Sequence, residues 1–141
     1  MTLARRRGWV SVGLVTLMAW GLSACNSSPT APVGNEVIVE NFEGTLTGGS
    51  VVVTFVVGQR GTVSVLLRNA FQSATSLQIT LGMAVGSWDG TTCELLVKND
   101  ASTFNTAISG SALPGNYCAT LYDVGNIGGN PVAYAIEVQH F

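Results

Sequence analysis

The stretch SVVVTFVVG (residues 50–58) decides the fold class. Its residues Val51, Val53, Phe55 and Val57 recur at every second position. Side chains on a β-strand point alternately to its two faces, so this period predicts a strand with one buried face. A helix would repeat its apolar residues about every 3.6 positions. No such repeat follows residue 25, so the chain is expected to be all-β.

The same two-residue period recurs along the chain, interrupted by turn-forming residues about every ten positions. About eight short strands in this arrangement are typical of an antiparallel β-sandwich, whose two sheets pack roughly 10 Å apart. The turns are expected at residues 47–49, 58–61, 89–90, 99–100, 114–115 and 128–131. The strands are expected within residues 37–42, 50–57, 61–67, 76–88, 93–97, 116–124 and 132–141. The expected core includes Val63, Val65, Leu67, Leu77, Ile79, Leu81, Met83, Val85, Cys93, Leu95, Val97, Tyr117, Ala119, Leu121, Tyr134, Ile136 and Val138.

Composition predicts an extracellular protein and excludes one class of partner. Charged residues make up 10% of the 141 residues, against about 25% in a typical soluble domain. Low charge with 17 glycines and many valines and threonines is typical of an extracellular all-β protein. Residues 25–141 carry three basic residues against eight acids, a formal charge of −5. A nucleic-acid partner is excluded, because binding phosphates requires a basic face.

The first 24 residues predict a cleaved signal peptide. Arg5, Arg6 and Arg7 precede the apolar run GWVSVGLVTLMAWGLSA (residues 8–24). This run is shorter than the ~20 residues that a membrane-spanning helix needs, and small residues end it. A retained membrane anchor and an ordinary secretory cleavage site are the alternatives.

Leu22-Ser23-Ala24-Cys25 resembles the lipobox of bacterial lipoproteins. The resemblance implies cleavage before Cys25 and acylation of its thiol and new amino group, which makes membrane lipid the first expected partner. Asn26, where an aspartate often signals retention at the inner membrane, implies the outer membrane. Residues 25–35 would then be a lipidated tether, whose ten residues after Cys25 reach at most ~35 Å. Residues 36–141 would be the β-sandwich domain.

Cys93 and Cys118 remain once Cys25 carries lipid. An oxidising compartment favours a disulfide between them, and each lies near the start of an expected strand, so the two strands are expected to lie side by side. Two free buried thiols are the alternative. A metal site is not expected, because zinc usually takes four ligands and His140 is the one histidine of the chain. No cofactor is expected.

Three groups of residues carry a resemblance to a known family: Pro114, Gly115, Tyr117 and Leu121; Tyr134, Ile136 and Val138; and, at the front, Phe42, Gly44, Leu46 and Gly49. In these positions the chain resembles the bacterial pre-peptidase C-terminal domain, over most of residues 36–141. The resemblance implies a β-sandwich of jelly-roll type, which in that family trails secreted hydrolases and is linked to secretion or substrate adhesion. Ser76 stands where the family often has an aspartate, which weakens the inference of a calcium site.

Catalysis is not expected. A hydrolytic triad needs a base beside a nucleophile, and His140 lies away from any serine elbow motif in the sequence. Paired carboxylates could serve a glycosidase, but most of the eight acids lie at expected turns or strand edges. The loops at residues 99–100 and 123–126 could offer oxygen ligands to calcium, which takes six to eight of them. Neither loop has the acid spacing of a known calcium loop.

A ligand patch is hypothesised at Trp88, Asp89, Tyr122 and Asp123, where aromatic and acidic side chains could bind a glycan or a peptide. The alternative is that Trp88 closes the core while Asp89 and Gly90 make a tight turn. The sequence therefore predicts a non-catalytic, lipid-anchored surface or periplasmic module for binding or adhesion, with a glycan or protein partner. A structural envelope lipoprotein without a ligand is the alternative, and a hydrolase accessory or an enzyme is a more remote one.

Overall fold

A computed structural model describes residues 36–141. The predicted signal peptide, Cys25 and the tether lie outside the described residues. None of residues 36–141 forms a helix long and apolar enough to span a membrane. The nine strands are β1 (Ile38–Leu46), β2 (Ser50–Val57), β3 (Gly61–Gln72), β4 (Leu77–Gln78), β5 (Leu81–Trp88), β6 (Cys93–Ser102), β7 (Ala107–Ala112), β8 (Gly115–Tyr122) and β9 (Val132–His140).

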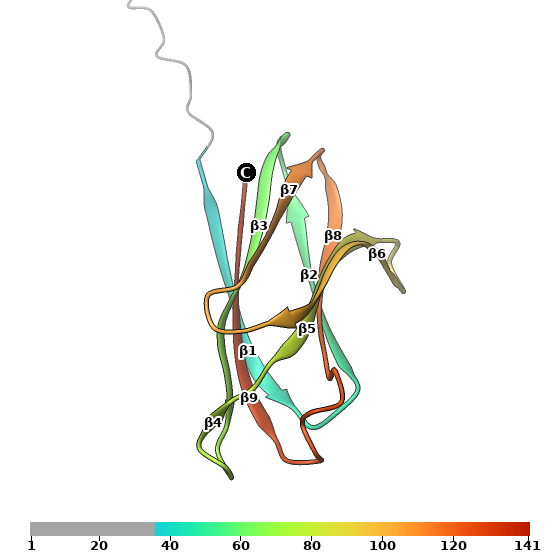
Figure 1. Cartoon of the computed structure of the whole chain (residues 1–141). Helices are drawn as coiled ribbons and strands as arrows, with labels where there is room; N and C mark the ends of the chain where they lie inside the picture. Colours follow the sequence, from blue (N-terminus) through green and yellow to red (C-terminus); the bar gives the residue numbers. More distant parts are fainter. Residues whose placement is uncertain (1–35) are drawn as a thin grey trace, which may run out of the picture. The chain divides into compact units, whose positions relative to one another are not determined.

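The strands form two antiparallel sheets with the topology of a jelly roll (Figure 1). In the first sheet the order is β1-β9-β3, with β7 and the two-residue β4 both paired to β3. In the second sheet the order is β2-β8-β5-β6. Leaving β4 aside, eight strands divide into two four-stranded sheets, and the chain passes repeatedly from one sheet to the other, as in jelly rolls. The predicted fold class is confirmed.

In most strands the buried side chains are those that the alternation of apolar residues predicts. On β9 every second side chain is buried, from Val132 through Ile136 to His140. The β9 residues face the second sheet, whose Phe55 and Leu121 belong to the same core cluster. Each long strand thus buries one face between the sheets, which is the stable way for a sheet to remove its apolar side chains from water.

Residues 76–88 form two strands in different sheets instead of the one strand expected. β4 ends at Gln78 and pairs with β3, whereas β5 begins at Leu81 and pairs with β8. At the corner between them, the Ile79 N–H donates to the Ala70 carbonyl at 2.8 Å. The period of two continues through this corner, so it could not show that the chain changes sheet. Leu77, expected in the core, is exposed as a result.

The region of β6 and β7 differs most from the expectation. Asn99 and Asp100, expected in a turn, lie inside β6 at a register shift between Leu81 and Met83 of its neighbour β5. The chain turns instead after Ser102, and β7 was not predicted at all. In its sequence AISGSA (residues 107–112), Ile108 is the one large apolar residue. The period of two is therefore too weak to see in β7.

Candidate binding site

Cys93 and Cys118 form a disulfide with their Cα atoms 5.8 Å apart. The two strands are not neighbours, contrary to the expectation, because β5 lies between β6 and β8. Gly86 on β5 lets the β6 backbone approach closely, because a Cβ at this position would lie 2.7 Å from the carbonyl carbon of Glu94. The disulfide thus fastens the start of β6 over the outer face of the second sheet, where Cys118 is fully buried.

Asp89 organises the turn that leads from β5 into β6. Its Oδ1 accepts the N–H groups of Thr91 and Thr92 at 2.8 and 2.7 Å, and both threonine hydroxyls also donate to its carboxylate. The Thr92 side chain, followed by the other donors, holds the pKa of Asp89 well below its usual range. The neighbouring Trp88 is half-buried. The carboxylate of Asp89 is therefore occupied by its own turn.

Tyr122 and Asp123 lie at the end of β8. The Tyr122 hydroxyl donates to Asp100, which raises the pKa of Tyr122 to about 12. Its ring covers Gly82, where a Cβ would collide with it. Burial raises the pKa of Asp123, but the N–H groups of Gly125, Asn126 and Ile127 outweigh it and bring that pKa below its ordinary value.

The four residues of the hypothesised ligand patch do not come together. Tyr122 pairs with Gly82 near the start of β5, and Trp88 ends that strand six residues later. At about 3.3 Å per residue, roughly 20 Å separate the two aromatic residues. The structure therefore divides the patch into two sites at opposite ends of β5.

Oxygen atoms of the two loops considered for calcium are already engaged. The Asp100 carboxylate accepts from Tyr122 and, at 3.1 Å, from the Lys98 ammonium group. Asp123 accepts the N–H groups of its own loop. Within residues 36–141 no group of three or more histidine, cysteine, aspartate or glutamate side chains could hold a metal ion.

His140 is buried, although the expected core did not include it. Its Nε2 lies 2.8 Å from Glu40 Oε1, and its ring stacks on Phe55 with the ring centroids 5.7 Å apart. Nδ1 is buried without a hydrogen-bond partner. The sequence could have predicted this burial, because His140 continues the every-second-residue pattern of inward side chains in residues 132–138. His140 thus closes one end of the core.

β6 exposes three consecutive large apolar side chains at the edge of the second sheet. Leu95, Leu96 and Val97 are 48%, 63% and 49% exposed, although Leu95 and Val97 were expected in the core. A β-bulge explains the run: Val85 pairs with Val97 but Gly86 pairs with Leu95, so Leu96 is an extra residue. The missed signal was the unbroken run Leu95-Leu96-Val97, since a strand with one buried face alternates.

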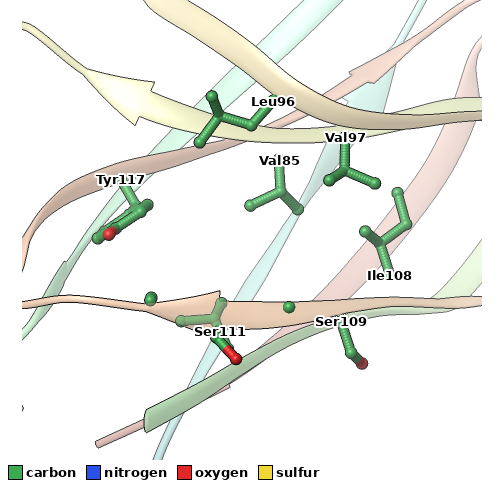
Figure 2. Close-up of a pocket in the computed structure, with 10 residues that line it drawn as sticks. Val85, Leu96, Val97, Ile108, Ser109, Ser111 and Tyr117 are labelled. Atoms are coloured by element: carbon green, nitrogen blue, oxygen red, sulfur yellow. The ribbon is translucent and has the colours of Figure 1, made fainter. Parts of the chain in front are cut away.

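An apolar cleft of about 70 Å³ opens between β6 and β7. Figure 2 shows Leu96, Val97 and Val85 on one side and Ile108 reaching toward them from β7. The hydroxyls of Ser109 and Ser111 point away from the cleft (Figure 2). The volume is about half that of the ~150 Å³ cavities that admit benzene. The cleft therefore fits one short aliphatic side chain.

Two further residues define the walls of the cleft. Tyr117 lines one end, and its hydroxyl both donates to the Leu113 carbonyl and accepts the Leu113 N–H, at 3.0 and 3.2 Å. Gly110 lies on β7 opposite Val63, and a Cβ built on it would have no atom within 4 Å. The two hydrogen bonds thus hold the Tyr117 wall of the cleft in place, and the cleft is wider at Gly110 because glycine has no side chain.

Comparison with known proteins gives a distant structural similarity. No family model matches the chain, and no curated protein matches it. Among solved structures, the chain is similar to the pre-peptidase C-terminal domain of a collagenase from Bacillus anthracis, with 18% sequence identity and a TM-score of 0.47. The alignment covers 70% of this chain and 85% of that one. The sequence resemblance pointed to the same kind of domain, but the assignment of the jelly roll here rests on the strand order.

Proposed function

We propose that the chain is a lipid-anchored, non-catalytic module of the bacterial envelope that holds an extended segment of a partner protein at β6. The observation that carries the proposal is the run Leu95-Leu96-Val97, exposed on an edge strand, in which Leu96 and Val97 line an apolar cleft. Soluble proteins rarely expose contiguous large apolar side chains unless they bind something there. An edge strand also presents a row of unpaired N–H and C=O groups, to which an extended peptide can add as a further strand.

A peptide fits this surface better than a glycan. Among residues 36–141, Phe104 is the one aromatic residue in the exposed class, and it lies alone in the turn before β7. The Tyr122 hydroxyl is bound to Asp100, and Trp88 lies at the other end of β5. A glycan site would need aromatic faces and free polar groups together. The β6 surface instead offers aliphatic side chains and strand backbone, which suit an extended aliphatic peptide.

Lipid anchoring at Cys25 accounts for the odd cysteine. Cys93 and Cys118 are paired, so Cys25 is the remaining one of three cysteines, and it ends the sequence Leu22-Ser23-Ala24-Cys25. Asn26 favours the outer membrane. Cells fed a palmitate analogue should label the wild-type protein and leave Cys25→Ser unlabelled. Equal labelling of the two proteins would refute the anchor.

Binding at β6 is tested by selecting linear peptides from a displayed library on the mature chain carrying Cys25→Ser. We expect enrichment of uncharged peptides that alternate aliphatic and polar residues. Their binding should be lost in Leu96→Asp and kept in Leu77→Asp, a matched control because Leu77 is 57% exposed on β4 in the other sheet. Enriched peptides that bind Leu96→Asp as well as wild type, or no enrichment at all, would overturn the proposal. The second outcome would favour a structural envelope role without a ligand.

A further inference from the structure

One end of the domain is defined by strand register. β1 begins there, since Ile38 pairs with His140 near the end of β9. The turn from β2 to β3 lies at the same end, because Gly58 donates its N–H to the Phe141 carbonyl at 2.9 Å. The turn from β7 to β8 also lies there, since Ala112 pairs with Gly61. The chain enters the domain at this end, directly after the tether.

This end carries a rim of exposed apolar side chains, each between 46% and 61% exposed. The charged side chains at this end are few: Arg60, Glu36 and Glu40, whose carboxylate lies 2.8 Å from His140 Nε2. The rim is therefore apolar and carries few charges. The tether rim consists of Val37, Ile38, Val39, Val56 and Leu113.

The opposite end of the domain has a different surface. Its loops cover residues 47–49, 73–76 and 123–131, which are mostly glycine, serine, threonine and asparagine. The exposed large apolar residues near these loops are Leu77 and Val124. Polar loops of this kind suit contact with water. The two ends are thus built for different surroundings.

The length of chain before the domain indicates what the tether rim meets. Ten residues separate Cys25 from Glu36, the first residue of the domain. A flexible chain of that length has a typical end-to-end distance of about 18 Å and a maximum reach of ~35 Å. Acyl chains on Cys25 would keep the rim at a high effective concentration beside the lipid surface. Contacts too weak to recruit the domain alone then suffice to orient it.

We propose that the tether rim rests on the membrane, with its aliphatic side chains in the headgroup region of the bilayer. The inference rests on the proposed anchor at Cys25. Apolar side chains of membrane-bound surfaces enter this boundary to a depth of about 5–10 Å. The rim would hold the domain in one orientation, with the polar loops of the opposite end turned toward water.

Single-tryptophan fluorescence in vesicles tests this orientation. The mature chain contains one tryptophan, Trp88, so Trp88→Phe gives a tryptophan-free background. Leu113→Trp and Leu77→Trp are then made separately, because the two leucines are similarly exposed, at 59% and 57%, and lie at opposite ends. Each acylated protein is reconstituted into phosphatidylcholine vesicles with and without brominated acyl chains. We expect brominated lipid to quench Leu113→Trp at least about twofold and Leu77→Trp hardly at all.

Flotation of the same vesicles separates the two proposals. Acylated protein that fails to float with vesicles would refute the anchor and, with it, the orientation. Protein that floats but shows equal quenching at both positions, or none at Leu113→Trp, would refute the tether rim and leave the anchor standing. A rim covered by a second copy of the chain would belong to the latter case, because lipid would not reach the probe.

Discussion

β9 and β6 show opposite outcomes of the same sequence pattern. Both were predicted as strands with one buried face. On β9 that face is buried throughout, from Val132 to His140. On β6 the bulge at Leu96 puts Leu95 and Val97 on opposite faces, and both are half-exposed. β9 lies between β1 and β3, and β6 is at the edge of its sheet. Alternation indicates which side chains share a face, but a bulge can break that alternation, and the sequence does not show whether the opposite sheet covers the face.

The largest expected effect is on the free energy of unfolding, and it compares a buried residue of β9 with an exposed residue of β6. Ile136→Ala removes a buried side chain between the two sheets and should lower the free energy of unfolding by about 4 kcal/mol. Leu96→Ala on β6 should change it by no more than about 0.5 kcal/mol, because Leu96 is exposed. Urea unfolding of the oxidised proteins measures both. Similar losses in the two variants would mean that β6 belongs to the core.

The disulfide should have the next largest effect. It closes a segment of 25 positions and fastens the start of β6. The chain-entropy model gives about 3.5 kcal/mol for a loop of this size. The double variant Cys93→Ser, Cys118→Ser should therefore unfold at lower urea concentration, with faster amide hydrogen exchange in β6 than in β9. Uniformly faster exchange in both strands would contradict a local role at the edge.

A smaller effect concerns the turn into β6 and depends on pH. The pKa of Asp89 is lower in the folded chain than its ordinary value of 3.8. Its carboxylate therefore contributes stability above that ordinary value, and the contribution is lost as the pH falls below it. The difference in unfolding midpoint between wild type and Asp89→Asn should shrink between about pH 5 and pH 2. A difference that stays constant over this range would show that the carboxylate charge plays no part.

The sequence predicted the fold through three strands with one well-buried face. Residues 50–57, 61–67 and 132–140 alternate because each lies against the opposite sheet, and this pattern is enough to identify a sandwich. The corner at Ile79 escaped because the period of two continues through it, and β7 escaped because Ile108 is its one large apolar residue. Asn99 and Asp100 looked like a turn, yet tertiary pairing with β5 keeps them in β6. Pairing with a neighbouring strand outweighs the local preference of these two residues for a turn.

The candidate site was predictable in part. The Cys93–Cys118 pair followed from the compartment and the cysteine count, and the structure contains it. The cleft was not predictable, since it depends on the bulge at Leu96 and on two edge strands from different sheets. Trp88 and Tyr122 were grouped by residue type, although register places them at opposite ends of β5. Side-chain chemistry alone does not bring residues together.

The most direct test of binding at β6 is the affinity of Gly110→Val for a linear peptide selected on the wild-type protein. The new side chain would enter the cleft, where a Cβ meets no atom within 4 Å. Replacing a strand glycine should leave the protein as stable as before or raise its stability by up to about 1 kcal/mol. We expect titration calorimetry to show an affinity at least about tenfold lower than that of wild type. An unchanged affinity in this folded variant would contradict the assignment of the cleft as the binding site.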